Sequence, residues 1–149
     1  MTALRCAATT AALFATASVR AAAPPICEKL LPVAAVERAT GVGPLRVAGL
    51  NEVKYGGGTC NYAQGDKMVL LLTVDEGAGK WEKLYKATFK GSKPVAGVGE
   101  DAFSAGEALY LKKGSTVVGI GRFVNLASGK PYLDDAKLLA VARDIAAKL

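Results

Sequence analysis

For chemistry, the most informative property of this sequence is that its 149 residues include no histidine. Histidine is the usual general base near neutral pH, a frequent zinc ligand and the partner of serine and cysteine nucleophiles. The acidic residues that could replace it come as neighbours, at 75–76, 100–101 and 134–135. Adjacent side chains on a strand or helix diverge, so none of these pairs forms a two-carboxylate centre by spacing alone. We therefore expect no catalytic residues and favour a protein that is not an enzyme.

The glycine-rich and cysteine-containing segments offer no cofactor or metal site. Residues 56–58 are three glycines, but they lack the Gly-Lys-Ser/Thr ending and the following helix of a phosphate-binding loop. The Gly-x-Gly pairs at 97–99 and 119–121 lack the third glycine that opens a helix in a dinucleotide fingerprint. No segment supplies the alternating oxygen ligands of a calcium loop. We therefore expect neither a cofactor nor a metal ion.

The segment 94–103 is the strongest candidate for a ligand site. Pro94 and two glycines give it an unusual backbone path, and Phe103 at its end is expected to insert into the core. A conformationally demanding loop is the simpler interpretation, and the lip of a binding groove is the functional one. The residues predicted to line that groove are Trp81, Tyr85, Glu100, Asp101 and Phe103.

The start of the chain has the pattern of an export leader. Arg5 supplies a positive charge, residues 6–19 form an uncharged run rich in alanine, and three alanines at 21–23 are small enough for a signal peptidase. We predict that residues 1–23 are a signal peptide. The uncharged run has about 14 residues, whereas a bilayer span needs about 20. We expect no stable membrane insertion after cleavage, and a periplasmic or secreted product.

Two cysteines, Cys27 and Cys60, remain after removal of the leader. In an oxidising compartment, an even number of cysteines is most simply interpreted as one disulfide. Two free thiols or half of a metal site are the alternatives, but the chain has no further cysteine and no histidine to complete a zinc shell. A disulfide would connect an N-terminal helix to the sheet.

The net charge does not indicate nucleic-acid binding. Two of the 19 basic residues lie in the predicted leader, which leaves 17 basic residues against 13 acidic ones and a charge of +4. Basic residues are not concentrated around aromatic or groove-reading elements, so we expect no nucleic-acid partner. The lysines at 80–90 are interpreted as a solvated helix face, with docking of an acidic partner as the alternative.

The expected partner is an unidentified envelope protein or a small ligand, and no oligomeric state is indicated.

The order of the predicted elements favours one α+β domain over residues 24–149. Apolar spacing of three and four predicts helices at 28–40, 80–90 and 132–149. Strands are predicted at 45–55, 59–63, 67–75, 101–104, 108–112 and 115–124. Tight turns between neighbouring strands favour an antiparallel sheet packed with about three helices, in the order α-β-β-β-α-β-β-β-α.

Three finer predictions concern the packing of these elements. The strand 67–75 is apolar on both faces, so we expect it at the centre of the sheet and covered on both sides. Gly119 and Gly121 leave room for a covering element to approach closely. The helix at 132–149 is expected to bury a stripe consisting of Leu138, Ala142, Ile145 and Leu149.

Several short blocks resemble those of a bacterial envelope family. They are Cys27 with Leu30-Leu31, Ala39-Thr40-Gly41, Cys60-Asn61-Tyr62 and the segment 94–103. Together they resemble exported proteins and lipoproteins of the DUF3558-like type. The resemblance implies an exported α+β protein with a bridge between Cys27 and Cys60, and it lends no catalytic residues. The chain departs from the lipoprotein members because it lacks a lipid-attachment cysteine at the predicted cleavage site.

We therefore expect an exported periplasmic or secreted protein, a non-enzymatic binding or interaction module of the cell envelope. Two alternatives stay open: an enzyme with an unconventional carboxylate, lysine or tyrosine centre, and a structural or inhibitory protein that docks through its sheet edges. A pocket with two convergent carboxylates or a desolvated lysine would favour the first alternative. An exposed unpaired strand edge would favour the second.

The exported product of the full chain should begin near residue 24 and lack the two hydrogens that disulfide formation removes. Intact-mass measurement of the protein recovered from the periplasm or the medium, under non-reducing conditions, tests the cleavage and the bridge together. A product with its N-terminus intact and with titratable thiols would contradict both predictions.

Overall fold

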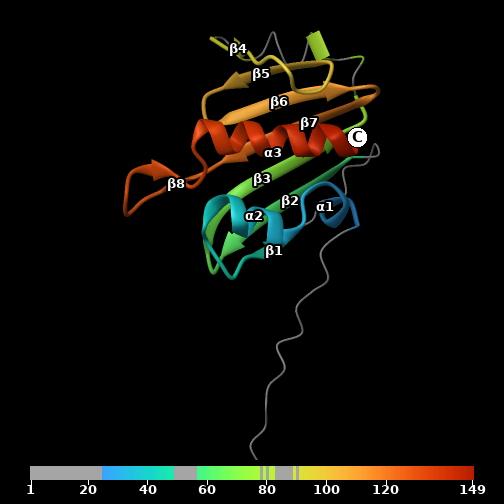
Figure 1. Cartoon of the computed structure of the whole chain (residues 1–149). Coiled ribbons are helices and arrows are strands. Elements are labelled where there is room, and N and C mark those ends of the chain that lie inside the picture. Colours follow the sequence, from blue (N-terminus) through green and yellow to red (C-terminus); the bar gives the residue numbers. More distant parts are fainter. Residues whose placement is uncertain (1–24, 49–56, 78, 80, 83–88, 90) are drawn as a thin grey trace, which may run out of the picture.

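A seven-stranded antiparallel sheet forms the centre of the molecule, with strand order β1-β2-β3-β7-β6-β5-β4 (Figure 1). The structure is a computed structural model that describes residues 25–48, 57–77, 79, 81–82, 89 and 91–149. The sheet and three helices confirm the predicted α+β class and antiparallel pairing. The predicted leader, and most of the helix predicted at 80–90, lie outside the described residues.

The helices are α1 (Pro25–Leu30), α2 (Val33–Thr40) and α3 (Asp135–Lys148). The strands of the sheet are β1 (Arg46–Ala48), β2 (Gly58–Gln64), β3 (Lys67–Asp75), β4 (Lys93–Pro94), β5 (Asp101–Ala105), β6 (Ala108–Lys113) and β7 (Thr116–Arg122). A separate two-stranded hairpin consists of β8 (Val124–Asn125) and β9 (Lys130–Pro131). The predicted strand 115–124 is therefore divided, because the chain leaves the sheet after Arg122.

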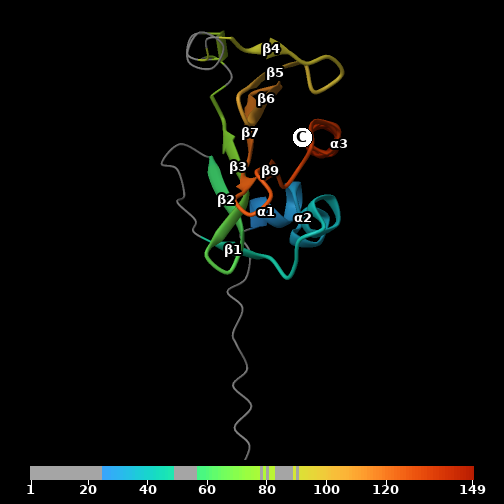
Figure 2. The ribbon, with the colours of Figure 1, turned by 90° about the vertical axis from the view of Figure 1, so that its left-hand side faces the viewer.

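All three helices lie on one face of the sheet, as Figure 2 shows. The main core is built between that face and the helices, where Leu72, Ile120 and Leu111 are fully buried. β3 has the predicted central position, between β2 and β7. On its other face Leu71 and Thr73 are only half-buried, so the described helices cover one side of β3 and not both as predicted.

A break at Pro32 divides the N-terminal helical segment, which was predicted as one helix over 28–40. The residue before a proline is disfavoured in the helical conformation. Pro32 itself takes an extended conformation, with φ −57° and ψ 146°, and α2 begins after it. The predicted end of the helix at Thr40 is confirmed, since Gly41 has φ 70° and donates its N–H to the Glu37 carbonyl.

The disulfide between Cys27 and Cys60 ties α1 to β2, as predicted. Both cysteines are buried in the main core. Two residues further along β2, the Tyr62 hydroxyl donates to the Leu31 carbonyl. Burial raises the pKa of the Tyr62 hydroxyl, with the charge of Glu28 adding to the effect. One covalent bond and one buried hydrogen bond therefore hold α1 against the sheet at neighbouring points.

At Gly119 the side chains that come closest belong to the adjacent strands β3 and β6. A Cβ at Gly119 would lie 2.6 Å from Thr73 Oγ1 and 3.0 Å from Tyr110 Cε1. At Gly121 a Cβ would lie 3.6 Å from Leu71 Cβ, an ordinary contact. The glycine in the middle of β7 thus gives room to the Tyr110 ring across the ladder.

Helix α3 closes the main core from the C-terminal side. Asp134 caps its N-terminus by accepting a hydrogen bond of 2.8 Å from the Lys137 N–H. Near the other end, Lys148 Nζ donates to the Leu30 carbonyl at 2.8 Å, which connects α3 to α1. The buried residues are Leu138, Val141, Ala142, Ile145 and Ala146. The predicted stripe was wrong at Leu149, which stands at the helix end and is 37% exposed.

Replacing Cys27 and Cys60 together by alanine should lower the free energy of unfolding by about 3 to 4 kcal/mol, because the unfolded chain loses the closed loop of 33 positions. Denaturant titration of the variant and of the wild type measures the difference. Wild type treated with a reductant serves as the control and should approach the variant. Equal stability of oxidised wild type and the double variant would contradict the expected contribution of the bridge.

Candidate functional site

Three of the five residues predicted for a groove pack against each other. Trp81 Nε1 donates to Asp101 Oδ2 at 2.8 Å, and the ring centroids of Trp81 and Phe103 are 5.2 Å apart. Trp81 is 3% exposed and Phe103 2% exposed, so almost none of either ring is available to a ligand. These rings lie in a second, smaller core with Val117 and Tyr110. Tyr85 lies outside the described residues.

Glu100 makes a different set of contacts, at the turn between β6 and β7. Its carboxylate accepts a hydrogen bond of 3.0 Å from the Gly114 N–H and pairs with Lys112 Nζ at 3.2 Å. The Gly114 hydrogen bond, and then Lys112, hold the pKa of Glu100 below its ordinary value. Glu100 therefore fastens the loop before β5 to the turn after β6.

The glycines of the segment 94–103 have a structural role. Gly97 and Gly99 have φ of 72° and 60°, a region that other residues rarely adopt. A Cβ at Gly99 would also lie 2.6 Å from the Lys112 carbonyl oxygen, which accepts from the Glu100 N–H at 2.9 Å. The unusual backbone path predicted for this segment lets it pass close to β6.

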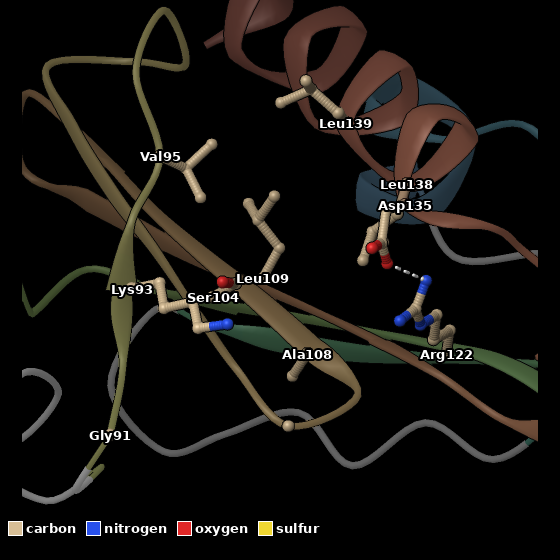
Figure 3. Close-up of a pocket in the computed structure, with 11 residues that line it drawn as sticks. Gly91, Lys93, Val95, Ser104, Ala108, Leu109, Arg122, Asp135, Leu138 and Leu139 are labelled. Carbon is tan, nitrogen blue, oxygen red and sulfur yellow. Dashed lines mark ion pairs between the residues drawn. The ribbon is translucent and has the colours of Figure 1, made fainter.

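A hollow of about 450 Å³ lies on the helix-covered side of the sheet, between α3 and the strands β4 to β6 (Figure 3). Apolar side chains make much of its surface, with Leu109 on β6 facing Leu138 and Leu139 on α3. Its lining residues are Gly91, Lys93, Val95, Ser104, Gly106, Ala108, Leu109, Arg122, Asp135, Leu138 and Leu139. An apolar cavity with a few polar groups is typical of a small-ligand site.

Opposite charges stand on facing walls of this hollow. Lys93 extends from the edge strand β4, and Asp135 lies on the first turn of α3 (Figure 3). Lys93 is exposed, and the Asp135 side chain is 92% exposed. A ligand in the hollow therefore meets a cation on one side and a carboxylate on the other, with apolar surface between them.

Arg122 forms one end of the hollow and fixes its geometry. Its Nη1 lies 2.7 Å from Asp135 Oδ1 and its Nε 2.6 Å from Glu107 Oε2. Nη1 also donates to the Leu133 carbonyl at 2.9 Å. Burial alone would lower the pKa of Arg122, but the two carboxylates raise it above its ordinary value. The guanidinium therefore remains charged and connects β7, the β5–β6 turn and the start of α3.

Lys93, Arg122 and Asp135 are distant in the chain, and no sequence pattern predicted that they line one hollow. One signal was present for Arg122. The alternating positions Val118, Ile120 and Arg122 share one face of β7, so an arginine stands where the pattern expects a core residue. A charged side chain at an inward position indicates that it is paired with a side chain of opposite charge.

In the described part of the chain, no three His, Cys, Asp or Glu side chains gather in a way that could hold a metal ion. None of the helices described is both long and apolar enough to cross a membrane.

Comparison with known proteins gives no match, whether to protein-family models, to curated proteins or to solved structures. The hollow is therefore interpreted from its own residues.

Replacing Glu100 by glutamine keeps an acceptor for the Gly114 N–H and removes the charge. The pKa of Glu100 is lower in the folded state than in the unfolded chain, so its charge stabilises the fold at pH values above the ordinary carboxyl pKa. This stabilisation is lost as the pH falls through the lowered pKa. The E100Q variant should be less stable than wild type at neutral pH, and this difference should shrink at an acidic pH below the ordinary carboxyl range. Denaturant titrations at a neutral and at an acidic pH test this. A stability difference that is the same at both pH values would contradict a role for the charge.

Proposed function

We propose that the chain is an exported, non-enzymatic binding module of the cell envelope, and that it holds a short apolar peptide with free termini in the hollow between α3 and β4 to β6. The observation that carries this proposal is the placement of Lys93 and Asp135 on facing walls with apolar surface between them. Lys93 suits the carboxylate of such a ligand. Asp135 pairs with Arg122 through Oδ1, but its side chain is 92% exposed and suits the ammonium group of the ligand. Leu109, Leu138 and Leu139 suit an apolar side chain.

The polar groups around the hollow support binding more than catalysis. The two carboxylates nearest its end, Glu107 and Asp135, are both ion-paired with Arg122. Lys93 is exposed, so it is not the desolvated lysine that an unconventional enzyme centre would use. The whole chain also lacks histidine.

Docking through sheet edges has weaker support. The edge strand β4 has two residues, one of which, Pro94, has no N–H to donate. A short edge strand and a proline at the edge are features that limit strand addition by another chain.

Export to the envelope is supported by three features of the chain. The disulfide between Cys27 and Cys60 is compatible with a compartment outside the cytoplasm. Residues 1–23 have the charge and apolar pattern of a leader. The blocks around the two cysteines and at 94–103 resemble exported proteins of the DUF3558-like type.

Isothermal titration with dipeptides such as Leu-Leu should detect binding to the wild-type protein, and Lys93→Ala should weaken it by roughly tenfold or more through loss of the carboxylate partner. The C-terminally amidated dipeptide lacks the free carboxylate, so it should bind wild type as weakly as Leu-Leu binds the K93A variant. Lys67→Ala is the matched control, since Lys67 is also exposed and does not line the hollow. Absence of binding by every free peptide, or an unchanged affinity in K93A, would reject the proposed site.

A further inference from the structure

The hairpin formed by β8 and β9 projects away from the sheet and its helices, at the left of Figure 1. It carries the most exposed apolar side chain described: Leu126 at its tip is 96% exposed. Phe123 and Val124, just before the tip, are 36% and 39% exposed. A contiguous exposed apolar group of this kind marks an interaction surface more often than isolated surface residues do.

Four backbone N–H groups of the tip, those of residues 127–130, have partners within the hairpin. Asn125 Oδ1 accepts from the Ala127 N–H at 3.0 Å, and the Asn125 carbonyl accepts from the Gly129 N–H at 2.8 Å and the Ser128 N–H at 3.2 Å. The Ser128 hydroxyl accepts from the Lys130 N–H at 3.3 Å. These bonds hold Leu126 outward, and they remain intact when water is excluded from around the tip.

The charges near the tip favour an anionic surface. Residues 123–129 are all uncharged. Lys130 follows on β9, and Lys67 lies beside the hairpin in the lining of a hollow of about 360 Å³. Among the described residues of that lining, Asp66 is the one that is acidic. Met68, Phe123 and Tyr132 extend the apolar surface from the tip into the same hollow.

We propose that this hairpin tip inserts into the interfacial region of an anionic lipid bilayer. Leu126 and Val124 enter the boundary between headgroups and acyl chains, while Lys67 and Lys130 contact lipid phosphates. A projecting apolar tip suits a fluid surface that closes around it, whereas a protein partner must supply a matching cavity. The tip is separate from the residues that line the peptide hollow, so this inference does not depend on the proposed function.

The test uses the full chain expressed in a bacterial host, with the product purified and sedimented with vesicles. Wild type should bind vesicles of equal parts phosphatidylglycerol and phosphatidylcholine, and bind pure phosphatidylcholine at least several-fold more weakly. Leu126→Asp should weaken binding to the anionic vesicles by roughly tenfold. Because Leu126 is 96% exposed, this variant keeps its packing, and an unchanged thermal midpoint verifies that it is folded.

Ser115→Asp is the matched control. It adds the same charge on an exposed residue in the turn before β7, at the opposite end of that strand from the hairpin, and should bind like wild type. Leu126→Trp reports insertion directly, through a blue-shifted emission that brominated lipids quench. The lipid assignment is overturned if wild type binds neither vesicle, or if L126D binds as wild type does. It is also overturned if the tip captures an envelope protein in a Leu126-dependent way while vesicles are not bound.

Discussion

The pairing of β3 with β7 joins the two halves of the chain into one sheet. Its register places Leu72 opposite Ile120 and Val74 opposite Val118, so the most apolar positions of both strands share the face under the helices. On the β3 side of this pair, the sheet continues through β2 and β1. On the β7 side, it continues through β6, β5 and β4. α3 also connects the two halves, through the hydrogen bond from Lys148 Nζ to the Leu30 carbonyl.

The two faces of the sheet are filled in different ways. On one face, α1 is held by the bridge to Cys60, and α3 is held by Lys148 at the Leu30 carbonyl. On the other face, Trp81, from the segment between β3 and β4, packs on Phe103, and the Tyr110 ring stacks on Phe103 with centroids 5.2 Å apart and lies over Gly119. Aromatic side chains on that face therefore contribute to packing, and the open hollow forms on the face where a helix stands away from the strands.

The end of β7 organises both proposed binding regions. Arg122 holds the start of α3 through Asp135 and the Leu133 carbonyl, which sets one end of the hollow. The next residue, Phe123, donates its N–H to the Val69 carbonyl at 3.2 Å and accepts from the Tyr132 N–H at 3.0 Å. These bonds fix the base of the hairpin against β3. Two surfaces with different chemistry are therefore oriented from one strand end.

Local features of the chain could be predicted from sequence because they depend on neighbouring residues. Alternating apolar positions and Gly65, with φ 58°, gave the hairpin of β2 and β3. A count of two cysteines beyond the leader left one possible pairing, between Cys27 and Cys60. The break at Pro32 was missed because a proline also fits the first turn of a helix, and only the packing of α1 on β2 distinguishes the two arrangements.

The sequence by itself determined the α+β class, most strand positions and the partners of the bridge. The tertiary structure decided which face of the sheet the helices cover, that Trp81 and Phe103 are buried side by side, and that Lys93 faces Asp135 across a hollow. Periodicity encodes which residues of one element share a face. It does not encode the register that brings residues tens of positions apart into contact, and that register is set by the packing of the whole chain.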